Sequence, residues 1–261
     1  MKLKNFNLKK KVFIIAEVGN NHEGNFNVAK KLVNLAAKAG ADAIKFQTFK
    51  TENFIRKKDI KRYRQLKRFE LSYEQFKSLK KLAHEKKLKF ISTPLDMESA
   101  NFLIKNVDLI KIASGDNNFF PLIDNVLDSK KPMIISTGMT NISQIKYLTN
   151  YIYKIIGKNS AKNRVALLHC VTSYPVEDQF ANLKSIEYLI KNSKLTIGYS
   201  DHTMGNEACI AAVAIGAKII EKHFTLNKNF SSFRDHSLSA DYTDLKNLVS
   251  GIRKVEKQLG K

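Results

Sequence analysis

Eight short apolar runs recur along the chain, separated by longer stretches of mixed polarity, and this alternation limits the possible folds. The runs occupy residues 12–19, 43–49, 88–94, 109–115, 132–138, 165–170, 195–200 and 217–224. The stretches between them, such as residues 27–40 and 72–87, place apolar side chains three and four residues apart, as amphipathic helices do. Buried strands that alternate with helices indicate a parallel sheet covered by helices. Eight such units in 261 residues predict an α/β fold, a single-domain (β/α)8 (TIM) barrel over residues 1–261, rather than an open doubly wound sheet.

Two segments depart from this alternation. Residues 1–11 precede the first apolar run and are expected to form a short arm or hairpin. Residues 50–71 form a charged insertion after the second run, which we expect to lie over the barrel mouth as a loop or short helix. The sequence shows no linker, low-complexity tract or second domain.

The sequence favours a cytoplasmic location. A basic start precedes the first apolar run, but that run contains Glu17 and leads into a polar turn rather than a cleavage site. No apolar run approaches the ~20 residues of a membrane span, so we expect no membrane partner. Cys170 and Cys209 lie in apolar segments and are expected to be core residues, because no secretory signal supports a disulfide.

The formal net charge is +21, and most of the excess comes from lysines in predicted helices. A nucleic-acid-binding surface instead gathers arginines and lysines on one face. Solvated helix faces explain the spread of lysines more simply, so we expect no nucleic acid partner. The charge should still draw anionic substrates toward the protein.

Polar side chains follow every predicted strand, at the end where TIM barrels place their chemistry. Buried polar groups without partners cost about 1–3 kcal/mol each, so such a rim is expected to hold a ligand. Lys45 and Lys111 lie inside apolar runs and should direct their ammonium groups toward an anion. The glycine-containing turns at 113–115 and 136–138 add hydroxyl donors, which together predict a phosphate or carboxylate pocket. For either lysine alone, a side chain that reaches solvent or a structural ion pair is the competing interpretation.

His202 follows the predicted strand at 195–200, and His223 lies at the end of the one at 217–224. The two strands are expected to be neighbours. Two imidazoles in equivalent positions predict a shared divalent cation, completed by water or substrate oxygens. A core or capping histidine is the alternative for each residue alone. The polar residues beside them in the sequence are expected at the same rim: Ser200, Asp201 and Glu221. Glu17 and Asp116 are the acid/base candidates, because a carboxylate near a metal and a carbonyl can relay a proton.

The motifs at these strand ends resemble those of the sialic acid synthase family, which joins phosphoenolpyruvate to an N-acetylated hexosamine to form nonulosonic acids. The matching segments are IIAEVGNNHEGN, IKFQTF, FISTP, KIASGDNNFFPLI, PMIISTGM, LLHCVTSYP, GYSDHT and IIEKHFTL, with the later DHSLS. Together they extend over most of the chain and are highly specific, whereas any one of them is a weak signal. The resemblance implies a TIM barrel, in agreement with the strand count, and a possible homodimer.

The resemblance also implies roles for residues in the matched motifs. The phosphoenolpyruvate pocket would be formed by Lys45, Thr93, Lys111, Ser114, Ser136, Thr172 and Ser200. A manganese or magnesium ion would be held by His202 and His223. The sugar would face Glu17, Gln47, Asp116, Tyr174 and Asp235. The catalytic residues would be Glu17, Lys45, Lys111, Asp116, His202 and His223. In the implied mechanism, the metal polarises the open-chain aldehyde, C3 of phosphoenolpyruvate attacks it, and water adds at C2 before phosphate leaves.

Three departures from the family pattern concern the sugar site and, at Thr172, the anion pocket. We expect a short form without the family's C-terminal antifreeze-like domain, whose arginine reaches the partner's sugar site. Thr172 stands where some relatives have asparagine, and the usual Gly-Pro before the late aspartate is replaced in NFSSFRDHS. The favoured function is condensation with N-acetylmannosamine or a 2,4-diacetamido-trideoxyhexose. The alternative is a catalytically weak barrel that binds these ligands or a partner subunit. A sister enzyme that acts on a sugar phosphate would need further basic residues, which the matched motifs do not supply.

Overall fold

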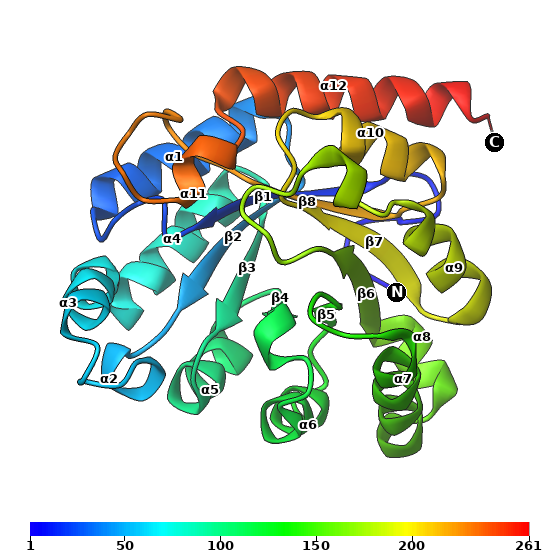
Figure 1. The fold of residues 1–261 in the computed structure, drawn as a ribbon, viewed down its shortest axis with the longest axis horizontal. Helices are drawn as coiled ribbons and strands as arrows, with labels where there is room; N and C mark the ends of the chain where they lie inside the picture. Colours follow the sequence, from blue (N-terminus) through cyan, green and yellow to red (C-terminus); the bar gives the residue numbers. More distant parts are fainter. Residues whose placement is uncertain (261) are drawn as a thin grey trace.

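The computed structural model describes residues 1–260 and confirms the (β/α)8 barrel (Figure 1). Its eight strands pair in parallel and in chain order, and β8 closes the sheet against β1. The strands are β1 (Phe13–Gly19), β2 (Ala43–Thr48), β3 (Lys89–Pro94), β4 (Leu109–Ile112), β5 (Met133–Ser136), β6 (Val165–Cys170), β7 (Thr196–Asp201) and β8 (Ile219–His223). Almost every strand residue is buried, which explains why the strands appear in the sequence as near-continuous apolar runs.

Helices surround the barrel, and two strands are followed by more than one helix before the next strand begins (Figure 1). The helices are α1 (Phe26–Ala39), α2 (Thr51–Phe54), α3 (Ile60–Phe69), α4 (Tyr73–Glu85), α5 (Met97–Asn106), α6 (Phe120–Asp128), α7 (Ile142–Ile156), α8 (Lys158–Arg164), α9 (Lys184–Asn192), α10 (Glu207–Ala214), α11 (Asp235–Leu238) and α12 (Tyr242–Gln258). Single 3-10 turns, η1 (Ser114–Asp116) and η2 (Asp178–Phe180), follow β4 and β6. Ser72, Asn141 and Asp241 form capping boxes, which stabilise the first turns of α4, α7 and α12.

Successive strand residues alternate between two apolar cores. Ile14 and Ile44 belong to the large core between the sheet and the helices, whereas Phe13 and Ile15 belong to a smaller core inside the barrel. Leu3 and Leu8 pack against this inner core, and Leu3 forms a β-bridge with Phe6. Residues 1–11 therefore close the barrel at the amino ends of the strands, which leaves the carboxyl ends as the open end of the interior.

The charged insertion at 50–71 forms α2 and α3 beside the barrel mouth, and it contributes no residue to the cavity there (Figure 1). The Phe69 ring contacts the Phe233 ring edge to face at 5.2 Å, which ties the insertion to the loop after β8. Gly24, in the loop after β1, has φ +80°, and a Cβ there would lie 1.9 Å from the Arg68 carbonyl oxygen. The insertion thus packs against two loops of the mouth.

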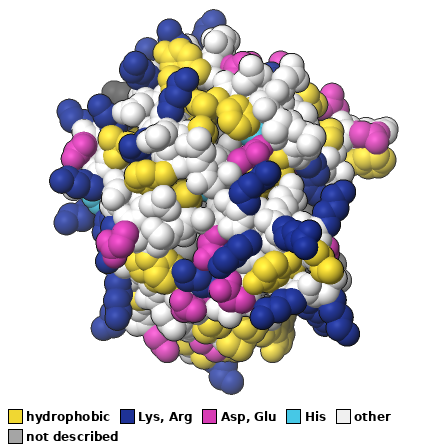
Figure 2. All heavy atoms as spheres, turned by 90° about the vertical axis from the view of Figure 1, so that its left-hand side faces the viewer, with side chains coloured by type: hydrophobic (Ala, Val, Ile, Leu, Met, Phe, Trp, Pro, Cys, Tyr) yellow, Lys and Arg dark blue, Asp and Glu magenta, His cyan; other side chains and the backbone are white. Residues whose placement is uncertain are grey.

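Lysine and arginine side chains are spread over the face shown in Figure 2 and are interspersed with acidic and uncharged ones. Within residues 1–260, no helix has both the length and the apolar character needed to cross a bilayer. Cys170 and Cys209 are buried free thiols, as predicted.

Candidate active site

A cavity of roughly 120 Å³ lies at the carboxyl ends of the strands, and all eight strands contribute to it. Its lining includes nearly all the residues predicted for the site: Glu17, Lys45, Gln47, Thr93, Lys111, Ser114, Ser136, Thr172, Tyr174, Ser200, His202 and His223, together with Glu221 and Cys170. These side chains are brought together because the strands are parallel, so their last residues meet at one end of the barrel.

Two buried lysines form the cationic part of the cavity. Lys45 Nζ lies 3.2 Å from a carboxylate oxygen of Glu17 and 3.2 Å from one of Glu221, and 3.4 Å from the Thr93 hydroxyl. Lys111 Nζ donates a hydrogen bond to Ser136 Oγ at 2.6 Å and lies 3.7 Å from Glu221 Oε1. Both ammonium groups therefore point into the barrel, as the sequence predicted, but carboxylates accompany them.

Glu17 and Glu221 are both buried, yet their pKa values move in opposite directions. Burial raises the pKa of Glu17 to about 7, because the attraction of Lys45 offsets only part of the desolvation and Glu221 adds repulsion. Burial also acts to raise the pKa of Glu221, but Lys111, Lys45 and a 2.9 Å hydrogen bond from Ser200 Oγ lower it to about 2. Glu17 can thus exchange a proton near neutral pH, whereas Glu221 is a permanent carboxylate.

The protonation of the lysines follows from the same contacts. Burial lowers the pKa of Lys45, but Glu17 and Glu221 outweigh this effect and leave it raised. Lys111 has a weaker contact with a carboxylate, and burial lowers its pKa. Lys45 is therefore the more firmly charged of the two.

The turns after β4 and β5 bring hydroxyls close to the lysines. The Gly138 N–H donates to Ser114 Oγ at 3.1 Å. A Cβ at position 138 would lie 2.4 Å from Thr172 Oγ1 and 2.7 Å from Ser114 Oγ. Glycine is therefore required here for three loops to approach one another, and their hydroxyls form one edge of the cavity.

His202 and His223 face each other with ring centroids 5.4 Å apart. His202 Nδ1 lies 2.8 Å from the Val171 carbonyl oxygen, which can only accept, so Nδ1 carries the hydrogen and Nε2 keeps a lone pair. Burial lowers the pKa of His223 to about 3, so this imidazole is neutral, and its buried Nδ1 has no hydrogen-bond partner in residues 1–260. In its neutral form, each ring offers a free lone pair, which fits a divalent cation.

Two features qualify this metal site. Among the described residues, no group of three or more His, Cys, Asp and Glu side chains is arranged to hold a metal, so water or substrate oxygens would have to complete the coordination of an ion on the two histidines. Burial lowers the pKa of His202, but its contacts with Cys170 and the Val171 carbonyl outweigh burial and leave the pKa raised. A metal there would therefore compete with a proton.

The partly buried Tyr174 ring packs against both histidines. Its ring centroid lies 4.1 Å from that of His202 and 5.9 Å from that of His223. The Arg234 guanidinium lies over the Tyr174 ring, 4.4 Å from its centroid. Sequence reasoning missed Arg234, because it lies in the long loop after β8, where no strand periodicity indicates which way a side chain points. Glu221 was also assigned no role from the sequence, although it lies two residues before His223 and therefore points to the same face of the strand.

Three predicted acidic residues lie outside the cavity lining. Asp116 belongs to η1 and is half-buried beside the cavity, and Asp235 is buried at the start of α11 with its carboxylate 3.2 Å from Arg234 Nε. The prediction that Asp201 shares the rim with His202 is wrong. Adjacent strand residues point to opposite faces, and Asp201 turns outward to pair with Lys222.

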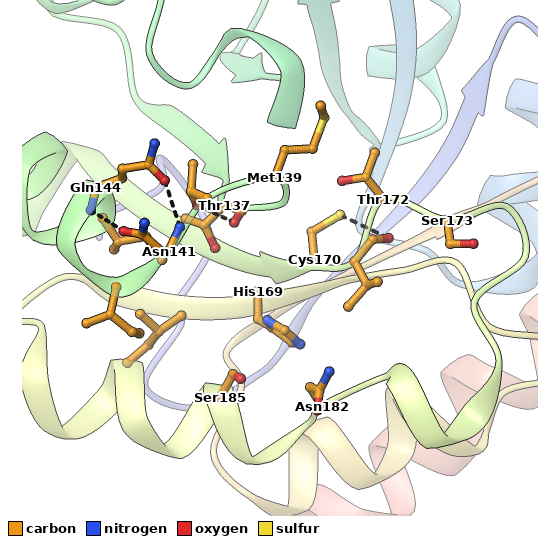
Figure 3. A pocket seen from close by; sticks show the side chains of 15 residues that line it. Thr137, Met139, Asn141, Gln144, His169, Cys170, Thr172, Ser173, Asn182 and Ser185 are labelled. Carbon is orange, nitrogen blue, oxygen red and sulfur yellow. Dashed lines mark hydrogen bonds between the residues drawn. The ribbon is translucent and has the colours of Figure 1, made fainter.

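A larger cavity, about 800 Å³, lies elsewhere, between α7 and α9 outside the barrel (Figure 3). His169, Asn182 and Ser185 line one side of it, and no charged residue contributes to its lining. It shares only Cys170 and Thr172 with the cavity at the strand ends. Because no lysine, arginine, aspartate or glutamate lines it, it does not compete as the site for a polyanionic substrate.

Comparison with known proteins agrees with the motifs. The NeuB family profile matches residues 32–261. The N,N'-diacetyllegionaminic acid synthase of Campylobacter jejuni is 41% identical over 96% of this chain and 78% of that protein. The N-acetylneuraminate-9-phosphate synthase of Homo sapiens is 35% identical over 95% of this chain and 71% of that protein. The crystal structure of N-acetylneuraminic acid (sialic acid) synthetase from Leptospira borgpetersenii in complex with citrate superimposes with a TM-score of 0.92, at 36% identity, over 100% of this chain and 90% of that chain.

Proposed function

The chain belongs to the NeuB family and is an enzyme of the sialic acid synthase type, and we propose that it condenses phosphoenolpyruvate with an N-acetylated amino sugar to give a nonulosonic acid and phosphate. The observation that carries the proposal is the cavity in which two buried ammonium groups, a ring of hydroxyls and two facing imidazoles meet. Such a cavity suits a small polyanion next to a polarised carbonyl group.

Phosphoenolpyruvate would occupy the lysine side of the cavity. Its carboxylate and phosphate need cations and hydroxyl donors, and the structure places Lys45 and Lys111 among the hydroxyls of Thr93, Ser114, Ser136, Thr172 and Ser200. The ammonium groups are already fixed by contacts with Glu17, Glu221 and Ser136, so little reorganisation is required when the anion binds.

His202 and His223 would hold a manganese or magnesium ion at the sugar side. When bound, such an ion would act as a Lewis acid toward the aldehyde oxygen of the open-chain sugar. The two ring centroids lie 5.4 Å apart, and the Tyr174 ring packs against both.

Glu17 is the residue best placed to move protons in this reaction. C3 of phosphoenolpyruvate forms a bond to the aldehyde carbon, and the aldehyde oxygen must gain a proton to become a hydroxyl. Protonated Glu17 can supply that proton, because its pKa is raised to about 7. The resulting carboxylate, 3.2 Å from Lys45, can then accept a proton from the water that adds at C2. The C2–O bond to phosphate then breaks, its electron pair leaves with the phosphate oxygen, the C2 hydroxyl gives its proton to the departing phosphate, and a ketone forms at C2.

The sugar would extend from the histidine pair toward Gln47, Tyr174 and the nearby Asp116 and Asp235. Asn20 Nδ2 donates to Gln47 Oε1 at 2.8 Å and so fixes the amide. The relative with 41% identity is named for a diacetylated product, whereas the human relative, with 35% identity, is named for N-acetylneuraminate 9-phosphate. We therefore place a 2,4-diacetamido-trideoxyhexose first among the sugars, ahead of N-acetylmannosamine. A homodimer and a cytoplasmic location stay predictions.

The test is direct synthesis. Purified protein is incubated with manganese, phosphoenolpyruvate and each candidate sugar, and phosphate release is followed together with the mass of the product. Lys45→Met serves as the matched control, because it removes one ammonium group from the cavity. Product formation that depends on both substrates is the expected result. Tight binding of phosphoenolpyruvate without phosphate release from any sugar would favour the alternative, a ligand-binding barrel of weak activity.

A further inference from the structure

A buried ion pair lies directly behind the two histidines, on the outer face of the barrel. Asp201 Oδ2 and Lys222 Nζ are 2.6 Å apart, and their side chains are 0% and 1% exposed. Cys209 of α10 donates to the same carboxylate, so the pair is enclosed between β7, β8 and that helix. Neither residue lines the cavity, and neither can contact a substrate there.

Both members of the pair make further hydrogen bonds. Asp201 Oδ1 accepts from Tyr199 Oη at 2.9 Å and from both the N–H and the hydroxyl of Thr203 at 2.8 Å. Lys222 Nζ also donates to the Thr203 carbonyl oxygen at 2.5 Å. A buried ion pair adds little stability over an apolar pair of similar volume, so its presence calls for a reason other than stability.

The position of the pair in the sheet supplies that reason. Asp201 and Lys222 form the last registered pair of the β7–β8 ladder. His202 and His223 are the next residues along the chain, beyond the last β7–β8 pair, although His223 still pairs with Glu17 of β1 on the other side of β8. The contacts of Asp201 and Lys222 also fix both backbone polar groups of Thr203, so His202 lies between two anchored residues.

The histidines need such support from the backbone. An imidazole that binds a metal is normally oriented by a hydrogen bond from its second nitrogen to a carboxylate, carbonyl or water. His202 has this bond to the Val171 carbonyl, but His223 has no hydrogen-bond partner for Nδ1 in the described part of the chain. The direction of the His223 ring therefore depends on its backbone, which β1 and Ala240 hold on one side and the end of the β7–β8 ladder holds on the other.

We propose that Asp201 and Lys222 are positioning residues, which hold the ends of β7 and β8 together so that His202 and His223 can share one divalent cation. This inference rests on the proposed function, since that function places the cation on the two histidines. The charged pair is suited to the task because its 2.6 Å contact and its surrounding hydrogen bonds are directional, whereas an apolar pair would allow the strand ends to slide.

The test compares two double variants of the full chain. Asp201→Asn with Lys222→Met removes the charges, while the Asn carbonyl can still accept from Thr203. Asp42→Asn with Arg253→Met removes an ion pair of similar length, 2.7 Å, between the start of β2 and α12, far from the cavity. Manganese affinity is measured by calorimetry without substrate, phosphoenolpyruvate affinity is measured separately, and urea unfolding reports the stability of each variant.

We expect the Asp201/Lys222 variant to bind manganese about 10-fold more weakly, within the range seen when residues that orient metal ligands are changed. Its affinity for phosphoenolpyruvate should stay unchanged, and the Asp42/Arg253 variant should bind manganese as the unaltered protein does. If the Asp201/Lys222 variant does not fold, Thr203→Val removes only the hydroxyl bond to Asp201, and it should weaken manganese binding in the same direction.

Unchanged manganese affinity in the folded Asp201/Lys222 variant would overturn the inference, as would an equal loss in the Asp42/Arg253 variant, because the effect would then follow stability alone. Absence of manganese binding by the unaltered protein would overturn it too. Failure of the proposed function is a separate result: the unaltered protein would bind manganese and respond to the Asp201/Lys222 change, yet form no product with any sugar.

Discussion

Replacement of Glu17 by glutamine should change how the stability of the protein depends on pH. The carboxyl of Glu17 is 2% exposed, and burial raises its pKa from an ordinary value of 4.5 to about 7. Between these two pH values, the unfolded chain has lost the proton while the folded protein keeps it. The folded state therefore binds more protons, and its free energy of unfolding falls as pH rises through this window.

The magnitude follows from the size of the pKa change. At 1.36 kcal/mol per pH unit, a rise from 4.5 to about 7 corresponds to roughly 3 kcal/mol of stability, fully present below pH 4.5 and lost by pH 7. Glutamine cannot titrate, so Glu17→Gln removes this contribution. Relative to the unaltered protein, the variant should gain about 3 kcal/mol between pH 4.5 and pH 8.

Urea unfolding at closely spaced pH values measures this difference, because contributions from all other groups largely cancel between the two proteins. Glu74→Gln is the matched control, since it removes an exposed carboxylate on α4. We expect the control to follow the pH dependence of the unaltered protein. If the difference between Glu17→Gln and the unaltered protein is constant from pH 4.5 to pH 8, burial does not raise the Glu17 pKa, and the proton-transfer role loses its physical basis.

Two further substitutions test the two halves of the cavity. His223→Ala should abolish metal-dependent turnover and reduce manganese binding by at least about 10-fold. Urea unfolding should stay nearly unchanged, because an imidazole at the rim contributes little to the apolar core. Turnover that still responds to manganese would contradict the metal assignment. Lys111→Ala should raise the Michaelis constant for phosphoenolpyruvate by about 10-fold or more, since a charge-assisted contact contributes roughly 1.5–3 kcal/mol. The Michaelis constant for the sugar should change little. An unchanged constant for phosphoenolpyruvate would mean that the anion binds elsewhere.

The sequence predicted those parts of the molecule that follow from strand periodicity. Eight apolar runs indicated eight buried parallel strands, and the polar residues at their ends, such as Lys45 and His223, do line one cavity. Alternation could also have placed Asp201 correctly. If His202 faces inward, its neighbour on the strand must face outward, and the same reasoning applies to Lys222 beside His223.

Periodicity gives no guidance in loops and insertions, and there the sequence predicted less. Arg234 reaches Tyr174 from a loop whose course depends on its packing against α3, through the contact of Phe233 with Phe69. The insertion at 50–71 lies beside the mouth for the same reason, because its apolar residues pack with Phe233 in the loop after β8 and its backbone at Arg68 lies against Gly24 in the loop after β1. These contacts join segments far apart in the sequence, so no local pattern indicates them.

The pairing of Glu221 with the two lysines explains how a cavity for a polyanion can exist before the anion binds. Two buried ammonium groups would repel each other and lose their protons to desolvation, and the lowered pKa of Lys111 shows this tendency. Glu221 lies 3.2 Å from Lys45 and 3.7 Å from Lys111, so one carboxylate contacts both lysines and favours their charged forms. Two charged lysines and this carboxylate would together carry a single net positive charge when Glu17 is protonated. An anion with several charges can still enter with a net electrostatic gain, and the cavity needs no other counter-ion to fold.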